Sequence, residues 1–210
     1  MKVILSGGGT GGHIYPALTI ADQIKKLCPD ADISFVGTQQ GLEKDIIPRY
    51  GYPLKFIEVA GFRRSLSLDT LRSAAKLVAG LYDAYRIIKN ERPDLVIGTG
   101  GYVCGPIVFM AALHGIPCCI QEQNAMPGVT NKILSRYVRK VFLGYKEASK
   151  YFHGKAELEY TGNPIRTEIL EHTREEALKE LGLDAAKKTI LVSGGSRGAR
   201  SINNAMLEAE

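Results

Sequence analysis

Short apolar segments alternate with amphipathic ones along most of this chain, and this pattern constrains the fold more than any other feature of the sequence. Repeated β-α-β order predicts an α/β fold, a Rossmann-like parallel sheet with helices on both faces. Strands are expected at 2–6, 33–37, 55–59, 94–98, 117–121, 140–143, 158–161 and 189–193. Helices are expected at 15–27, 68–90, 106–113, 129–137, 175–181 and 199–210.

Glycine-rich turns follow three of the expected strands, at 6–13, 98–102 and 193–199. Ligands of parallel sheets bind outside the carboxyl ends of the strands, where these turns lie. Glycine lets the backbone approach a ligand closely, and the N-terminus of the following helix attracts negative charge. The turns therefore predict anion-binding pockets that suit diphosphates.

Four polar side chains are candidates for chemistry. His13 directly follows the first glycines, where an imidazole could be a general base for a sugar hydroxyl or could simply bond to the backbone. Glu122 could orient His13 or an acceptor hydroxyl, and the Asn124 amide suits sugar hydroxyls, although both could also cap a turn. Arg166 could pair with a phosphate or lie on the surface.

A dinucleotide site is the main alternative for the first glycine turn. Gly7, Gly9 and Gly12 fit the G-x-G-x-x-G pattern, but the acid expected after the second strand is absent where Thr38 and Gln39 stand. This absence disfavours an NAD-dependent oxidoreductase. The D-x-D spacing at 30–32 precedes a strand, away from the binding turns, and is interpreted as a solvated turn.

The charge balance favours anionic partners, because the formal net charge is +5 and the sequence pI is about 9.0. The segment 62–68 combines arginines with apolar residues and could contact an anionic membrane surface. Since no stretch approaches the roughly 20 apolar residues of a membrane span, we expect peripheral contact. A nucleic-acid partner is not expected, because no recognition helix stands out.

The four cysteines form no C-x-x-C pair, so we expect buried free thiols and no metal site.

Five ordered motifs, at 7–17, 98–106, 122–124, 161–166 and 194–199, resemble the MurG family of GT-B glycosyltransferases (family 28) over the whole chain. The resemblance implies two Rossmann-like domains and inverting transfer of GlcNAc from UDP-GlcNAc. The acceptor would be the C4 hydroxyl of the muramyl sugar in lipid I, an undecaprenyl-diphosphate-linked muramyl pentapeptide, and the product lipid II. The family works in peptidoglycan synthesis, as peripheral proteins at the cytoplasmic face of the membrane. The resemblance implies neither a cofactor nor a catalytic metal.

The same resemblance assigns residues by position. It implies contacts to UDP-GlcNAc from Thr10, Gly11, Gly12, Asn124, Arg166 and Ser196. It places the acceptor diphosphate at Gly9, His13, Gly100, Gly101 and Tyr102, and His13 matches a histidine thought to assist catalysis. With Glu122, His13 is therefore a catalytic candidate. The sequence departs from the family pattern at Arg197, where glutamine is common, and at Gln121, where histidine is often found.

The domain prediction places an acceptor-binding Rossmann-like domain at 1–161 and the beginning of a donor-binding domain at 162–210. We expect this second domain to be cut short, which would leave the chain nearly inactive on its own. Two other functions stay open on the sequence. One is a related GT-B enzyme with another lipid acceptor, such as diacylglycerol, and the other is a non-catalytic module that binds lipid diphosphates.

Overall fold

The computed structural model describes residues 1–59, 68–194 and 198–209, excepting the side chains of 68–75 and 168. Internal contacts divide the chain into two units, Met1–Ile165 and Arg166–Glu210. The division lies close to the predicted domain boundary at 161–162. The first unit carries the sheet, and each unit is described by itself below.

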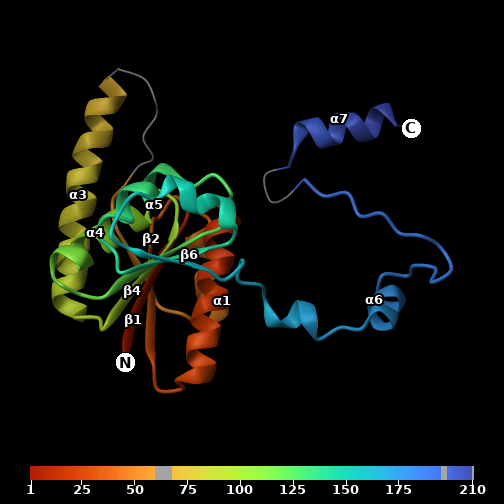
Figure 1. The fold of residues 1–210 in the computed structure, drawn as a ribbon, viewed down its shortest axis with the longest axis horizontal. Helices are drawn as coiled ribbons and strands as arrows, with labels where there is room; N and C mark the ends of the chain where they lie inside the picture. The colour runs from red at the N-terminus through yellow and green to blue at the C-terminus, as the bar shows by residue number, and fades with distance from the viewer. Residues whose placement is uncertain (60–67, 195–197, 210) are drawn as a thin grey trace. The chain divides into compact units, whose positions relative to one another are not determined.

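The first unit is built on a seven-stranded parallel sheet with the order β3-β2-β1-β4-β5-β6-β7 (Figure 1). The predicted parallel sheet is confirmed. The strands are β1 (Lys2–Gly7), β2 (Asp32–Gly37), β3 (Leu54–Phe56), β4 (Leu95–Gly100), β5 (Cys118–Glu122), β6 (Lys140–Leu143) and β7 (Glu157–Tyr160). The helices of this unit are α1 (Gly11–Leu27), α2 (Glu43–Ile46), η1 (Ile47–Tyr50), α3 (Leu68–Glu91), α4 (Cys104–Leu113), α5 (Val129–Leu134) and η2 (Lys146–Tyr151).

Alternate side chains of the central strands enter two separate cores, because successive residues of a strand point to opposite faces. On β1, Val3 and Leu5 pack with α1, whereas Ile4 packs with residues of α3 and α4. Figure 1 shows α1 on one face of the sheet and α3 and α4 on the other. Burial on both faces explains why the inner strands are nearly continuous apolar runs.

The strand order reverses at β1, which pairs with β2 on one side and with β4 on the other. The connection through α1 leads to β2, and the connection through α3 leads to β4 on the opposite side of β1. Such a switch point leaves a crevice at the carboxyl ends of the strands, where ligands bind. Gly7 and Gly100 are register partners there, so the first two glycine turns begin side by side.

The strand expected at 189–193 is wrong. Ile190 is 86% exposed and Leu191 is 89% exposed, and the described part of the second unit contains no strand that could pair with this segment. A single strand is unstable because its backbone groups need a neighbouring strand. The second unit contains η3 (Thr167–Leu170), α6 (Arg174–Glu180) and α7 (Arg200–Glu208).

Helix α6 is set by a local device in its sequence. Thr173 Oγ1 accepts a hydrogen bond from the Glu176 backbone, 3.3 Å away, and Glu176 Oε2 accepts one from the Thr173 backbone, 2.8 Å away. This capping box satisfies two backbone groups that a helix start leaves without partners. The bond from the Thr173 backbone lowers the pKa of the Glu176 carboxyl.

Candidate functional site

The first turn of α1 provides the backbone donors of the site. Thr10 is the N-cap residue, and its side chain makes no capping hydrogen bond. The first helical turn carries no acidic side chain that would occupy the positive end of the helix dipole. The amides of Gly11 and Gly12, which precede the regular helical bonds, are therefore placed to meet an anion.

His13 is held in one orientation by two acceptors. Its Nδ1 lies 3.0 Å from the Thr99 carbonyl oxygen and 3.1 Å from Gln123 Oε1. A carbonyl oxygen cannot donate, so Nδ1 must carry the hydrogen. In the neutral ring Nε2 then keeps its lone pair and can accept a proton. The imidazole is only half-buried, which leaves it accessible to a substrate.

The Gln123 carboxamide is itself fixed by a set of acceptors. Its Nε2 donates to the Thr99 carbonyl at 2.7 Å and to the Gln121 carbonyl at 3.2 Å, and it also contacts Gln121 Oε1. These acceptors occupy the NH₂ group of Gln123, and Oε1 is the atom that contacts His13 Nδ1. Asn163 extends the network, because its Nδ2 donates to the Gln123 carbonyl and its Oδ1 accepts from Gln121 Nε2, each at 3.2 Å.

The turn after β4 closes onto the turn after β1 only because it is made of glycine. Gly100 and Gly101 have φ values of +105° and +80°, which other residues rarely adopt. A Cβ at Gly100 would lie 2.8 Å from His13 Nδ1, and one at Gly101 would lie 2.5 Å from the Gly8 carbonyl oxygen. The Tyr102 ring lies on the same side, 3.3 Å from where a Cβ of Gly9 would be. The structure thus brings the predicted acceptor-diphosphate residues together.

Glu122 caps the loop that follows β5, which was one of the alternatives left open for it on the sequence. The residue is 1% exposed. Its Oε1 accepts from the Asn124 backbone and Nδ2, both at 2.9 Å, and its Oε2 accepts from the Gly128 backbone at 3.1 Å and Asn131 Nδ2 at 2.9 Å. The prediction that Glu122 orients His13 is wrong, because Gln123 makes that contact. Glu122 instead fixes the exposed Asn124 and the loop that follows β5.

The sequence of residues 3–143 matches the model of the glycosyltransferase family 28 N-terminal domain. That match covers more than half of the 210 residues. The chain belongs to glycosyltransferase family 28.

Individual family 28 relatives match over nearly the whole chain. A protein of Acetivibrio thermocellus named UDP-N-acetylglucosamine--N-acetylmuramyl-(pentapeptide) pyrophosphoryl-undecaprenol N-acetylglucosamine transferase is 54% identical over 208 residues, which are 99% of this chain and 56% of the relative. A Bacillus thuringiensis protein with the same name, numbered 2, is 48% identical over 209 residues, or 100% of this chain and 57% of the relative. The chain thus spans little more than half the length of these curated relatives.

Solved structures share the fold of this chain. The crystal structure of MurG from Acinetobacter baumannii has a TM-score of 0.63 and 33% identity, and the match covers 79% of this chain and 46% of that one. A UDP-GlcNAc 2-epimerase from Neisseria meningitidis shares the fold, with a TM-score of 0.60 at 12% identity over 87% of this chain and 52% of the other. The predicted Rossmann-like domain of GT-B type is confirmed.

Besides the role of Gln123, sequence reasoning missed Glu43, which lies beside the site. It is completely buried, and its Oε2 accepts from the Gly9 backbone at 2.9 Å. Its Oε1 accepts from the backbone and the hydroxyl of Thr38, at 3.0 and 2.8 Å. The only signal in the sequence was the pair Gly37 and Gly41 shortly before an acid, after a buried strand, and both glycines leave room for the Glu43 side chain. The carboxylate therefore ties the first glycine turn to the segment after β2.

Three sequence predictions concern residues that do not belong to the described part of the first unit. Arg166 is an exposed residue of the second unit, and its role as a phosphate partner stays a prediction. Ser196 and the membrane candidate 62–67 fall outside the described residues, as does the side chain of Leu68.

Among the described helices, none is long and apolar enough to cross a membrane. Nor do His, Cys, Asp and Glu side chains gather in threes as metal ligands within the described part of the chain.

The cysteines follow the prediction for the most part. All four are free thiols, and Cys104 and Cys118 are buried, whereas Cys119 is half-buried. Burial raises the pKa of Cys104 and Cys118 to about 12 and that of Cys119 to about 11. Cys28 differs from the prediction, because it lies exposed after the last residue of α1.

Proposed function

We propose that this family 28 chain serves an inverting transferase that moves GlcNAc from UDP-GlcNAc to the C4 hydroxyl of the muramyl sugar in lipid I. The observation that carries this proposal is the orientation of His13. Its Nδ1 hydrogen is directed at the Thr99 carbonyl, which leaves Nε2 as a proton acceptor at the mouth of the crevice. The name shared by relatives at about half identity supports the substrates.

In the proposed reaction, His13 Nε2 takes the proton of the acceptor hydroxyl as its oxygen attacks the anomeric carbon of GlcNAc. The bond from that carbon to the UDP oxygen breaks, and the configuration inverts because attack and departure occur on opposite faces. A base positioned in this way contributes a factor of roughly 10²–10⁴. Gln123 is a positioning residue, because it holds the ring in the required tautomer through its contact with Nδ1.

The glycine turns would supply the contacts to phosphate. We assign the donor to Thr10, Gly11, Gly12 and Asn124, with Arg166 and Ser196 from the C-terminal part, and the acceptor diphosphate to the turn at Gly100, Gly101 and Tyr102 with Gly9 and His13. The amides at the start of α1 support this assignment, because they stabilise negative charge on a departing diphosphate. The amide of Gly9 already donates to Glu43, so Gly9 would contribute shape rather than a donor.

The acceptor lipid places the proposed reaction at a membrane. We infer that the protein acts peripherally at the cytoplasmic face, in peptidoglycan synthesis, with residues 1–161 binding the acceptor and 162–210 beginning the donor-binding part. The net charge of +5 supports attraction to an anionic surface. The segment 62–68, with its arginines, is the proposed point of contact.

Sedimentation with liposomes tests the acceptor assignment. The 210-residue chain should sediment with liposomes that contain lipid I and much less with liposomes of equal negative charge without it. His13→Ala and Gly101→Trp should abolish the difference, because one removes the imidazole and the other fills the turn against the Gly8 carbonyl. His153→Ala, which removes an exposed histidine, is the matched control. Equal sedimentation with both liposomes would contradict the assignment.

A further inference from the structure

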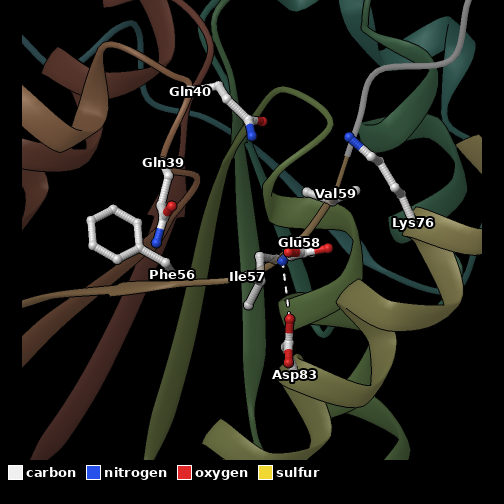
Figure 2. A pocket seen from close by; sticks show the side chains of 8 residues that line it. All are labelled: Gln39, Gln40, Phe56, Ile57, Glu58, Val59, Lys76 and Asp83. Carbon is white, nitrogen blue, oxygen red and sulfur yellow. Dashed lines mark hydrogen bonds between the residues drawn. The ribbon is translucent and has the colours of Figure 1, made fainter.

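A recess opens at the carboxyl ends of β2 and β3, and His13 is not among the residues that line it. Its volume is about 160 Å³. Figure 2 shows its lining, with Gln39 and Gln40 from the segment after β2, residues 56–59 from β3 and the segment after it, and Lys76 and Asp83 from α3. We call this recess the β2–β3 pocket. None of the residues that line it is a predicted donor or acceptor contact.

The β2–β3 pocket lies where ligands of such sheets bind, at the carboxyl ends of β2 and β3. Hydrogen bonds also link the segment that lines it to the candidate site. The segment that carries Gln39 and Gln40 begins at Thr38, whose backbone and hydroxyl donate to Glu43, while the other oxygen of Glu43 accepts from Gly9. The buried Glu43 carboxylate thus connects the first glycine turn to the segment that lines this pocket.

The opposite wall is held in place in the same way. The Glu58 backbone donates to Asp83 Oδ2 at 3.0 Å, as the dashed line in Figure 2 shows. This bond joins the segment after β3 to helix α3. The bond fixes one wall of the pocket, which is the kind of preorganisation that small-molecule sites usually have.

The lining indicates the chemistry of the ligand. Two carboxamides offer both donors and acceptors, Lys76 brings a positive charge, and Glu58 and Asp83 bring negative ones. Peptides carry groups that match this lining, namely amides, carboxylates and amines. A neutral sugar carries no charge that could pair with the charged side chains of the lining. Pockets that enclose a whole drug-sized ligand measure roughly 300–1,000 Å³. The smaller β2–β3 pocket suits an appendage of a larger ligand.

We propose that the β2–β3 pocket binds part of the peptide that the acceptor carries on its muramyl sugar. This inference rests on the proposed function, and it assigns a separate part of the acceptor to a separate set of residues. The diphosphate and the sugar remain at the glycine turns, and the peptide extends past Thr38 toward Lys76 and Gln40.

The test compares two acceptors that differ only in the peptide. One is a short-chain lipid diphosphate with the muramyl sugar and pentapeptide, and the other lacks the peptide. Their Kd values are measured by titration calorimetry for the 210-residue chain, for Lys76→Ala with Gln40→Ala, and for Arg86→Ala. Arg86 is the matched control, because it is an exposed cation of α3 outside the pocket.

The wild-type chain and Arg86→Ala should bind the peptide-bearing acceptor more tightly than the peptide-free one. The double substitution should weaken binding of the peptide-bearing acceptor by roughly three- to tenfold and remove its advantage. Equal affinity of the wild-type chain for both acceptors would overturn the peptide assignment and leave the proposed function standing. Equal weakening toward both acceptors would overturn it too. A wild-type chain that binds neither acceptor would refute the proposed function and the peptide assignment together.

Discussion

Glu43→Gln is the substitution that tests the architecture of the site most directly. All three partners of this buried carboxylate donate, namely the Gly9 amide and the amide and hydroxyl of Thr38. A glutamine carries one oxygen and one NH₂ group. Its NH₂ group must therefore face donors, either the Gly9 amide or the amide and hydroxyl of Thr38. The less costly orientation turns the NH₂ group toward Gly9 and keeps both bonds to Thr38.

The expected loss follows from these contacts. An unsatisfied buried donor costs about 1–3 kcal/mol, and the two bonds to Thr38 weaken by about 1 kcal/mol each when the acceptor loses its charge. Relief from burying a charge offsets part of this. We therefore expect a net loss of about 2–4 kcal/mol in the free energy of unfolding. For a unit of this size that lowers Tm by roughly 5–15 °C.

Thermal unfolding followed by circular dichroism measures this loss, with urea unfolding as a second estimate. Asp45→Asn is the control, because Asp45 is an exposed acid of the same helix, α2. Its effect should stay within about 0.5 kcal/mol. If Glu43→Gln unfolded within about 2 °C of the wild type, the carboxylate would not be the tie between the two segments that we infer.

Three further predictions concern other parts of the molecule. His13→Ala should lower kcat for GlcNAc transfer by about 10²–10⁴, measured with radiolabelled UDP-GlcNAc and the protein at the full length its gene encodes; an unchanged kcat would contradict its role as base. A thiol reagent at pH 8 should modify the exposed Cys28 quickly and Cys104 only on unfolding, because burial raises the pKa of Cys104 to about 12; rapid loss of both thiols in peptide mapping would refute the burial. Hydrogen bonds from Lys55 and Lys2 lower the pKa of Glu91, so its stabilisation is present above the ordinary value of 4.5 and is lost as pH falls through the lower folded pKa. Glu91→Gln should therefore be less stable than wild type at pH 7, with a difference that shrinks below pH 4.5, and a constant difference in urea unfolding would contradict this linkage.

The sequence predicted the inner strands well because burial on both faces leaves a strong apolar signal. Strand 140–143 was predicted at its observed bounds, and the predictions for β1, β4 and β5 differ from the structure by one or two residues. The segment 189–193 has an equally apolar sequence but forms no strand. A strand depends on a hydrogen-bonding neighbour, and local composition carries no information about that neighbour.

The site was predictable to the extent that each residue acts through its own position on an element. His13 and the glycines of the β4–α4 turn could be placed because both follow strands that end at one edge. The hydrogen-bond partners of His13 could not be predicted, because Gln123 and Glu122 are neighbours at the same strand end. Only the direction of each side chain decides that Gln123 faces the ring while Glu122 turns into the loop at Gly128.

The position of Glu43 also divides the first glycine turn into two parts with different roles. Gly9, in the first part, gives its amide to a carboxylate, and a Cβ at Gly8 would lie 2.7 Å from that same carboxyl group. A phosphate oxygen directly against Gly8 or Gly9 would meet this buried negative charge, so we expect the acceptor diphosphate proposed near Gly9 to take its hydrogen bonds from the Gly100–Tyr102 turn. Gly11 and Gly12, in the second part, begin α1, where the helix dipole and the first amides favour an anion. Under the proposed function, this turn closes on a carboxylate at one end and receives a phosphate at the other. Both need close backbone approach, which accounts for the glycines on either side of Thr10.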